Sequence, residues 1–162
     1  MTPLWMRIAI VAATIGSGLV AGTFFAFSAF VMPALGRLPK PQGIAAMQAI
    51  NVAAVTPLFM AVFVGTALLS LGLAIATFRS PVPGMNLVFW AALLYLVGSF
   101  VLTIAANVPL NDALAGVTPE TGGTVWSDYL RAWTLYNHVR TVASAAAMLT
   151  LILGLLRLPA ER

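Results

Sequence analysis

The stretch WTLYNHVRTVASAAAMLTLILGLLR, residues 133–157, decides how many helices this chain has. Only sixteen uncharged residues, Thr141 to Leu156, separate its two arginines. A helix that crosses a bilayer needs roughly 20 apolar residues, because the hydrocarbon core is about 30 Å thick and each residue rises about 1.5 Å. The segment is therefore long enough only if it begins near Trp133, which places His138 and Arg140 inside a membrane span.

Three longer uncharged segments precede this one, with 29 residues between Arg7 and Arg37, 38 between Lys40 and Arg79, and 32 between Arg79 and Asp112. The chain is 61% hydrophobic and 7% charged, with a mean hydropathy of +1.00. A soluble domain has about a quarter of its residues charged. The pattern predicts an all-α bundle of four transmembrane helices, at about 5–34, 57–78, 84–107 and 128–157.

A short amphipathic helix is predicted between the first and second spans. In GIAAMQAINVAAV (43–55), Ile44, Met47 and Ile50 recur near helical spacing, and Gln48 and Asn51 lie to one side. No internal repeat or linker divides the sequence, so we expect a single integral membrane domain over residues 1–162.

The basic residues predict the orientation in the membrane. One side of the predicted bundle has Arg7, Arg79, Arg157 and Arg162, and the other has Arg37, Lys40 and Arg131 together with Asp112, Glu120 and Asp128. Loops richer in Arg and Lys stay in the cytoplasm. We therefore expect a multi-pass protein of the cell membrane (plasma or inner) with both termini cytoplasmic. The apolar run after Arg7 continues past Phe30, which is too long for a signal peptide.

The expected partners follow from the same composition. The basic residues are scattered singly, which argues against nucleic acid as a partner and leaves membrane lipids and a hydrophobic small molecule. Gly18 and Gly22 form a GxxxG motif, in which small residues let two helix backbones approach closely. The motif predicts close packing within the bundle or a homo-oligomer, without choosing between them.

Polar residues of the predicted spans converge on one rim of the bundle. Arg140 lies 17 residues from Arg157, about 26 Å at 1.5 Å per residue, and so just inside the outer edge of the hydrocarbon. Asn107 and Ser28 reach a similar level on the third and first spans, and Gln48 and Asn51 follow on that side. At about 100° per residue, six side chains share an arc of about 160° on the last helix: Trp133, Thr134, Asn137, His138, Arg140 and Thr141.

Each of these residues also has a purely structural interpretation. Arg140 would be an interfacial anchor whose stem extends outward to lipid phosphate, and His138 a buried imidazole bonded to a carbonyl or an asparagine. Asn107 and Asn111 would satisfy the backbone groups at a helix C-terminus. The remaining residues, Trp126, Tyr129, Trp133 and Tyr136, would form an interfacial aromatic belt.

The residue types limit the chemistry that this rim can support. The chain has no cysteine and one histidine, so a metal site is not expected, and a haem with one histidine ligand is left open without other support. No acidic residue lies in the predicted spans, which argues against a proton-coupled transporter. His138 is the candidate general base, and Arg140 with the asparagines is the candidate group that stabilises an oxyanion.

Several stretches together resemble a bacterial and fungal membrane family, the anthrone oxygenase-like proteins: FFAFSAFVMPAL (24–35), GIAAMQAIN (43–51), TPLFM (56–60), NVPLND (107–112) and WTLYNHVRT (133–141). The resemblance implies a four-helix membrane protein. For the fungal members it implies oxidation of a polyketide anthrone to an anthraquinone by dioxygen, without metal or flavin. Bacterial members are mostly of unknown function.

Carried over by position, the resemblance points to Asn107, Pro109, Asn111, Asn137, His138 and Arg140. Two positions depart from the pattern, Tyr136 where tryptophan is usual and Thr56 where asparagine is usual. We predict a cofactor-free oxygenase with His138 and Arg140 as catalytic residues. The predicted substrate-binding residues are Asn107, Asn111, Asn137, Trp133, Tyr136, Gln48 and Asn51. The alternative is a non-catalytic four-helix protein that binds a lipophilic ligand, haem or a partner helix.

Overall fold

The computed structural model describes residues 3–79 and 82–159 of the chain. Within these residues, four helical segments are long and apolar enough to cross a membrane: Leu4–Arg37, Pro57–Thr77, Met85–Ala115 and Gly123–Arg157. The described part of the chain is a helical bundle without strands, as the composition predicts. This protein is a multi-pass membrane protein.

The first and third spans each contain π-helical turns. The first span consists of α1 (Leu4–Ala26), the π-helical segment η1 (Phe27–Val31) and α2 (Met32–Arg37). The third consists of α5 (Met85–Tyr95), the π-helical segments η2 (Leu96–Val101) and η3 (Thr103–Asn107), and α6 (Val108–Ala115). The second span is α4 (Pro57–Thr77), and the fourth is the single helix α7 (Gly123–Arg157).

Two prolines explain two of the three π-helical segments. Pro33 follows the end of η1 by two residues, and Pro109 follows the end of η3 by two residues. A proline donates no backbone hydrogen bond and clashes with the carbonyl four residues earlier. A wider π-helical turn at that point lets the helix continue. The third span therefore runs to Ala115, and the predicted end of a helix at Asn107 is wrong.

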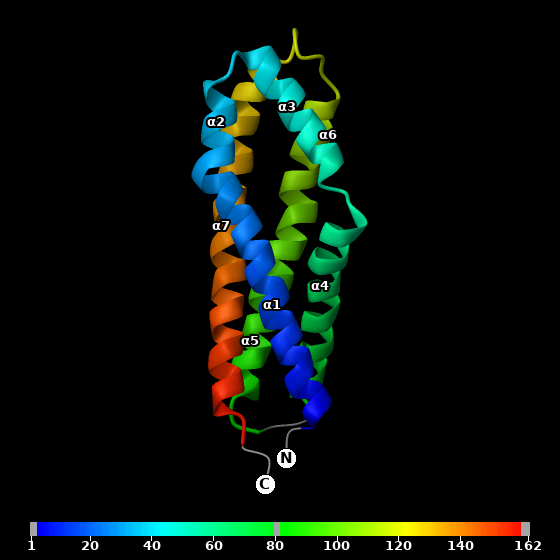
Figure 1. The fold of residues 1–162 in the computed structure, drawn as a ribbon, viewed down its shortest axis with the longest axis vertical. Coiled ribbons are helices and arrows are strands. Elements are labelled where there is room, and N and C mark those ends of the chain that lie inside the picture. Colours follow the sequence, from blue (N-terminus) through cyan, green and yellow to red (C-terminus); the bar gives the residue numbers. More distant parts are fainter. Residues whose placement is uncertain (1–2, 80–81, 160–162) are drawn as a thin grey trace.

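The helix α3 (Lys40–Ala53) is the predicted amphipathic helix. It crosses the end of the bundle opposite the N- and C-terminal helix ends (Figure 1), and it buries Gly43, Ile44 and Met47. We call the end at α3 the outer end and the opposite end the inner end, as names for the two ends of the bundle alone. Beyond it, α4 begins at Pro57, where the Thr56 hydroxyl accepts a hydrogen bond from the Phe59 amide at 3.2 Å. Thr56 therefore acts as the N-cap of α4. Because α4 is shorter than the other spans, it starts well below the outer end of the bundle (Figure 1).

The helix α7 is the central element of the packing, since it contacts α1, α5, α6 and both ends of the first span. Its residues contribute to three apolar clusters along the bundle, which contain Leu151 at the inner end, Ala147 in the middle and Trp126 at the outer end. At the inner end the chain turns into α5 through Gly84, whose φ of 92° is disfavoured for residues with a Cβ. A Cβ there would lie 2.4 Å from the Gly154 carbonyl oxygen.

The GxxxG residues face two different environments. A Cβ on Gly18 would lie 2.9 Å from the Met148 sulfur, so this glycine packs against α7 of the same chain. A Cβ on Gly22 would meet nothing within 4 Å, and Gly22 is exposed. The homo-oligomer predicted from this motif therefore stays a prediction.

Candidate functional site

Arg140 lies inside the bundle, where only 3% of its surface is exposed. One terminal nitrogen, Nη1, donates to the Thr103 hydroxyl at 3.1 Å, and the other, Nη2, donates to the Asn137 carbonyl oxygen Oδ1 at 2.8 Å. The guanidinium carbon lies 4.1 Å from the centre of the Phe24 ring and 5.1 Å from that of Trp133. The positive charge is therefore held by aromatic faces and neutral oxygens. This arrangement contradicts the interpretation of Arg140 as an interfacial anchor.

Asn137 is fully buried and connects α7 to the first span. Its amide nitrogen donates to the Phe24 carbonyl at 2.6 Å and to the Ser28 hydroxyl at 2.7 Å. Its amide oxygen is thereby turned toward Arg140. Asn137 is thus the residue that fixes the guanidinium relative to the first helix, and Ser28 lies at the rim where its depth predicts it.

Two buried polar atoms at this level have no hydrogen-bond partner within the described residues, Arg140 Nε and Asn107 Oδ1. Asn107 is 1% exposed, and its amide nitrogen donates to the Trp133 carbonyl at 3.3 Å. Buried polar groups without partners are uncommon in proteins. One free N–H donor on a cation and one free amide acceptor are groups that a polar ligand would satisfy.

The described part of the chain offers Arg140 no carboxylate partner. A buried charge without a counter-charge is expensive in a low-dielectric environment. Arg140 would therefore bind an anionic oxygen strongly, and this is the main electrostatic property of the site. We refer to Phe24, Ser28, Thr103, Asn107, Trp133, Asn137 and Arg140 as the arginine cluster.

A second hydrogen-bond network lies on the outer side of the arginine cluster. The Asn111 oxygen accepts from the Tyr129 hydroxyl at 2.8 Å and from the Trp133 indole nitrogen at 2.9 Å. Asn51 on α3 donates to the Tyr129 hydroxyl at 3.5 Å. The ring of Trp133 thus belongs to both networks, and Asn111 sets its orientation.

Gln48 connects α3 to the last turn of α6 and to the loop after it by hydrogen bonds. Its amide nitrogen donates to the Leu114 carbonyl at 2.8 Å and to the Val117 carbonyl at 3.0 Å. Both bonds are to backbone. Gln48 therefore holds α3 against the outer end of the third span. Neither of its hydrogen bonds is to Arg140.

The aromatic residues of α7 form a core rather than a belt at the membrane surface. Trp126, Tyr129 and Trp133 are buried, and successive rings stack at centroid distances of 5.7 and 6.1 Å. Tyr136 alone of the four is exposed. The interpretation as an interfacial belt is therefore wrong for the three buried rings.

The two predicted catalytic residues do not lie together. His138 is exposed on α7, and its imidazole has no hydrogen bond to any residue that the structure describes. At about 100° per residue, its side chain points about 160° away from that of Arg140 around the helix. The buried-imidazole interpretation is contradicted by the exposure. Tyr136, a predicted substrate-binding residue, likewise lies outside the arginine cluster.

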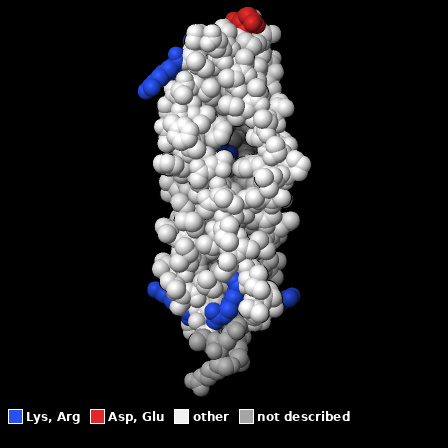
Figure 2. Space-filling model, in the orientation of Figure 1, with Lys and Arg blue, Asp and Glu red and all other residues white. Residues whose placement is uncertain are grey.

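The surface is hollowed between the first span and the connection from α3 to α4 (Figure 2). Basic atoms, drawn in blue, are visible at the floor of this hollow. Arg140 is the only arginine or lysine that the described residues bury. The hollow opens on the side of the bundle that would face lipid, because it lies along the spans and not at their ends.

The residues that sequence reasoning missed are Phe24 and Thr103. Both lie in long apolar segments, where a phenylalanine or a threonine has no distinguishing signal. Thr103 faces Arg140 from the junction of η2 and η3, so a regular helical wheel would not place it. Among the described residues, no group of three or more His, Cys, Asp or Glu could hold a metal ion.

Four spans around a buried arginine define the class of this protein as a polytopic helical membrane protein with a polar site toward the end of the bundle that α3 covers. The anthrone oxygenase family model matches residues 58–150, which is more than half of the chain. The chain belongs to the anthrone oxygenase family. Searches of curated proteins and of solved structures gave no match. The matched region contains Asn107, Asn111, Asn137 and Arg140, whereas Phe24 and Ser28 precede it.

Proposed function

We propose that this protein is a cofactor-independent oxygenase that oxidises a hydrophobic, anthrone-like aromatic in the arginine cluster. The observation that carries the proposal is the buried guanidinium of Arg140, which has an unpartnered N–H and no carboxylate partner within the described residues. An anthrone that loses a ring C–H proton places negative charge on its carbonyl oxygen. A fixed cation in a buried site stabilises that charge.

The reaction balances with dioxygen as the oxidant. Over the whole reaction the CH₂ carbon of the anthrone is oxidised to C=O, which removes four electrons. One oxygen atom of O₂ becomes the new carbonyl oxygen, and the other leaves as water with the two protons. Arg140 would bind the enolate oxygen through Nε, and the rings of Phe24 and Trp133 would bind the aromatic faces of the substrate.

The site also favours a substrate that arrives from the membrane. The hollow beside the first span opens along the spans (Figure 2), so a lipid-soluble aromatic would reach Arg140 without crossing the polar loops. We place the protein in the cell membrane with the arginine cluster toward the outer face, as the distribution of basic residues predicts.

The exposed position of His138 changes the proposed roles. A general base must come within about 3 Å of the proton it removes, directly or through one water. His138 lies on the other side of α7 from the arginine cluster, so we assign the catalytic effect to Arg140 and expect proton loss to water. If His138 were the base, as the sequence predicts, His138→Ala would lose activity.

The test is oxygen consumption by the purified protein in detergent with an anthrone as substrate. Removing a group that stabilises an oxyanion typically lowers kcat about 10²–10³-fold. We expect that loss for Arg140→Gln, little change for the exposed Arg131→Gln, and retained activity for His138→Ala. If Arg140→Gln consumes oxygen at the wild-type rate, the proposal is wrong. If His138→Ala alone abolishes activity, the imidazole and not the guanidinium is the main catalytic group.

A further inference from the structure

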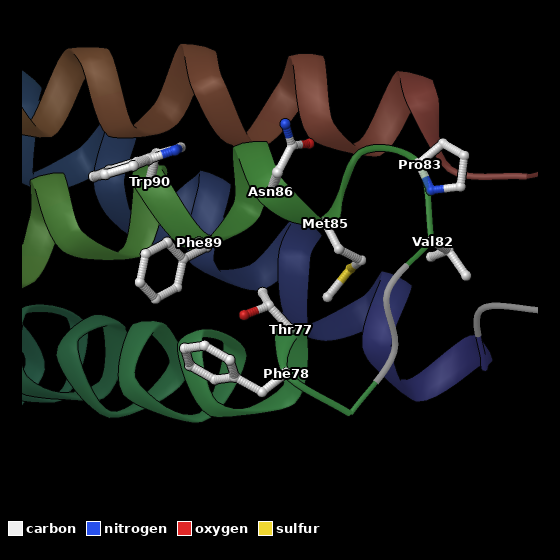
Figure 3. A pocket seen from close by; sticks show the side chains of 8 residues that line it. All are labelled: Thr77, Phe78, Val82, Pro83, Met85, Asn86, Phe89 and Trp90. Carbon is white, nitrogen blue, oxygen red and sulfur yellow. The ribbon is translucent and has the colours of Figure 1, made fainter.

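The end of the bundle opposite the arginine cluster contains two hollows, one on each side of the last turns of α4. The larger, about 450 Å³, lies between α4 and α5 and is lined by Phe78, Phe89 and Trp90 among others (Figure 3). The smaller, about 220 Å³, is lined by Trp5, Gly72 and Arg79 among others. Neither includes a residue of the arginine cluster.

The larger hollow is walled by aromatic rings that face lipid. The Phe78 and Phe89 rings meet edge to face at 5.5 Å, and the Phe89 and Trp90 rings also lie 5.5 Å apart. Phe78 is 77% exposed and Trp90 is 60% exposed. An exposed tryptophan near the end of a span is typical of the level at which lipid headgroups meet acyl chains.

The charge at this end is one-sided among the described residues. Arg79 lies in the wall of the smaller hollow and directly follows Phe78 of the larger one. Arg157 lies beside the turn into α5, since its Cβ is 3.2 Å from the point where a Cβ on Gly84 would be. The described acidic residues, Asp112, Glu120 and Asp128, belong to the other end of the bundle, where Figure 2 shows red atoms.

We propose that an anionic phospholipid binds at this end, with its phosphate at Arg79 and its two acyl chains along the two sides of α4. Two apolar hollows with an arginine between them match the shape of a two-chain lipid. The guanidinium groups of Arg79 and Arg157 have no hydrogen bond or ion pair to a residue that the structure describes, so both are open to a phosphate. Basic residues beside apolar grooves at the membrane surface favour anionic over zwitterionic headgroups. This inference is independent of the proposed oxygenase activity.

Native mass spectrometry of the full-length protein in detergent tests this proposal. The probes are phosphatidylglycerol and phosphatidylcholine with identical acyl chains, added in equal amounts. One arginine near the surface corresponds to about a fivefold preference for the anionic lipid. We expect the wild type to retain phosphatidylglycerol at least that strongly over phosphatidylcholine, and Arg79→Gln to lose about fivefold of the preference.

Two further variants separate the effect of the arginine charge on lipid binding from the effect of the apolar hollows. Gly72→Leu fills the smaller hollow, where a Cβ meets nothing within 4 Å, so the protein should fold and retain less of both lipids. Arg131→Gln, at the other end, should bind lipid as the wild type does. Equal retention of the two lipids by the wild type would overturn the proposal, and so would an unchanged preference in Arg79→Gln.

Discussion

Burying a guanidinium inside a membrane bundle costs free energy. Groups from three spans contact that of Arg140. Thr103 on the third span and Asn137 on α7 each accept one hydrogen bond, and Phe24 on α1 covers the face of the cation at 4.1 Å. Within the described residues, no partner of Arg140 supplies a negative charge. Neutral groups therefore surround the charge, and Nε still has an N–H for a ligand.

Asn137 should be the most sensitive position of the cluster for stability. Asn137→Ala removes hydrogen bonds to the Phe24 carbonyl, the Ser28 hydroxyl and Arg140, and it leaves the Arg140 Nη2 group without its acceptor inside the bundle. We expect the free energy of unfolding to fall by about 2–3 kcal/mol. Thermal unfolding in detergent measures this, with Tyr136→Phe as the exposed control. A melting temperature unchanged in Asn137→Ala would mean that these bonds contribute nothing to the fold.

At the residue scale, sequence reasoning found the amides and the arginine but not their orientation. Depth along each span places Asn107, Asn137 and Arg140 at one rim, and the structure brings them together. The helical wheel put His138 and Arg140 at opposite edges of one arc, and it could not tell which edge faces the bundle. Only the packing of α7 against α1 and α5 decides this.

The helices themselves depart from regular geometry on the two spans that flank the arginine cluster. η1 begins three residues after Phe24 and contains Ser28, and η3 begins at Thr103 and ends at Asn107. A wider turn shifts the following side chains around the helix axis. The sequence signals these segments only through Pro33 and Pro109, which is why the predicted third span ended too early.

Close approach of α1 and α4 depends on Gly16. A Cβ there would lie 2.0 Å from the Thr66 hydroxyl oxygen, which itself donates to the Val62 carbonyl at 2.6 Å. We expect Gly16→Ala to lower the free energy of unfolding by about 1–3 kcal/mol through overpacking.

Gly65→Ala is the matched control, because a Cβ on that glycine meets nothing within 4 Å. Alanine is a better helix former than glycine by about 1 kcal/mol, so this control should leave stability unchanged or raise it. Thermal unfolding of both variants in the same detergent gives the comparison. Equal effects of the two substitutions would show that the α1–α4 contact is looser than described.

The whole molecule is electrically asymmetric along its long axis. Acidic atoms are visible at one end and basic atoms gather mainly at the other (Figure 2), which is the end of Leu4 and Arg157.

The number and the order of the spans follow from the uncharged segments of the sequence alone. The short length of α4 and the hollow above it cannot be predicted from these segments, because they depend on how α3 folds over the outer end.

The orientation in the membrane is testable because the chain has no cysteine. Thr121→Cys and Pro159→Cys introduce single thiols at opposite ends, both at exposed positions. We expect a membrane-impermeant maleimide to label Thr121→Cys in intact cells and Pro159→Cys only after the cells are opened. The reverse pattern would place the termini, and the lipid site with them, on the outer side.

The ionisation of a bound phenol measures whether Arg140 stabilises an anionic oxygen of an aromatic ligand. Alizarin, a hydroxyanthraquinone, changes colour when its phenol loses a proton, so its absorbance reports its pKa in the presence of the protein. A nearby cation lowers the pKa of an acid by about 1–3 units. We predict a shift of that size with the wild type and with Arg131→Gln, relative to detergent alone, and its loss in Arg140→Gln. The same apparent pKa for alizarin with the wild type and with Arg140→Gln would contradict the account.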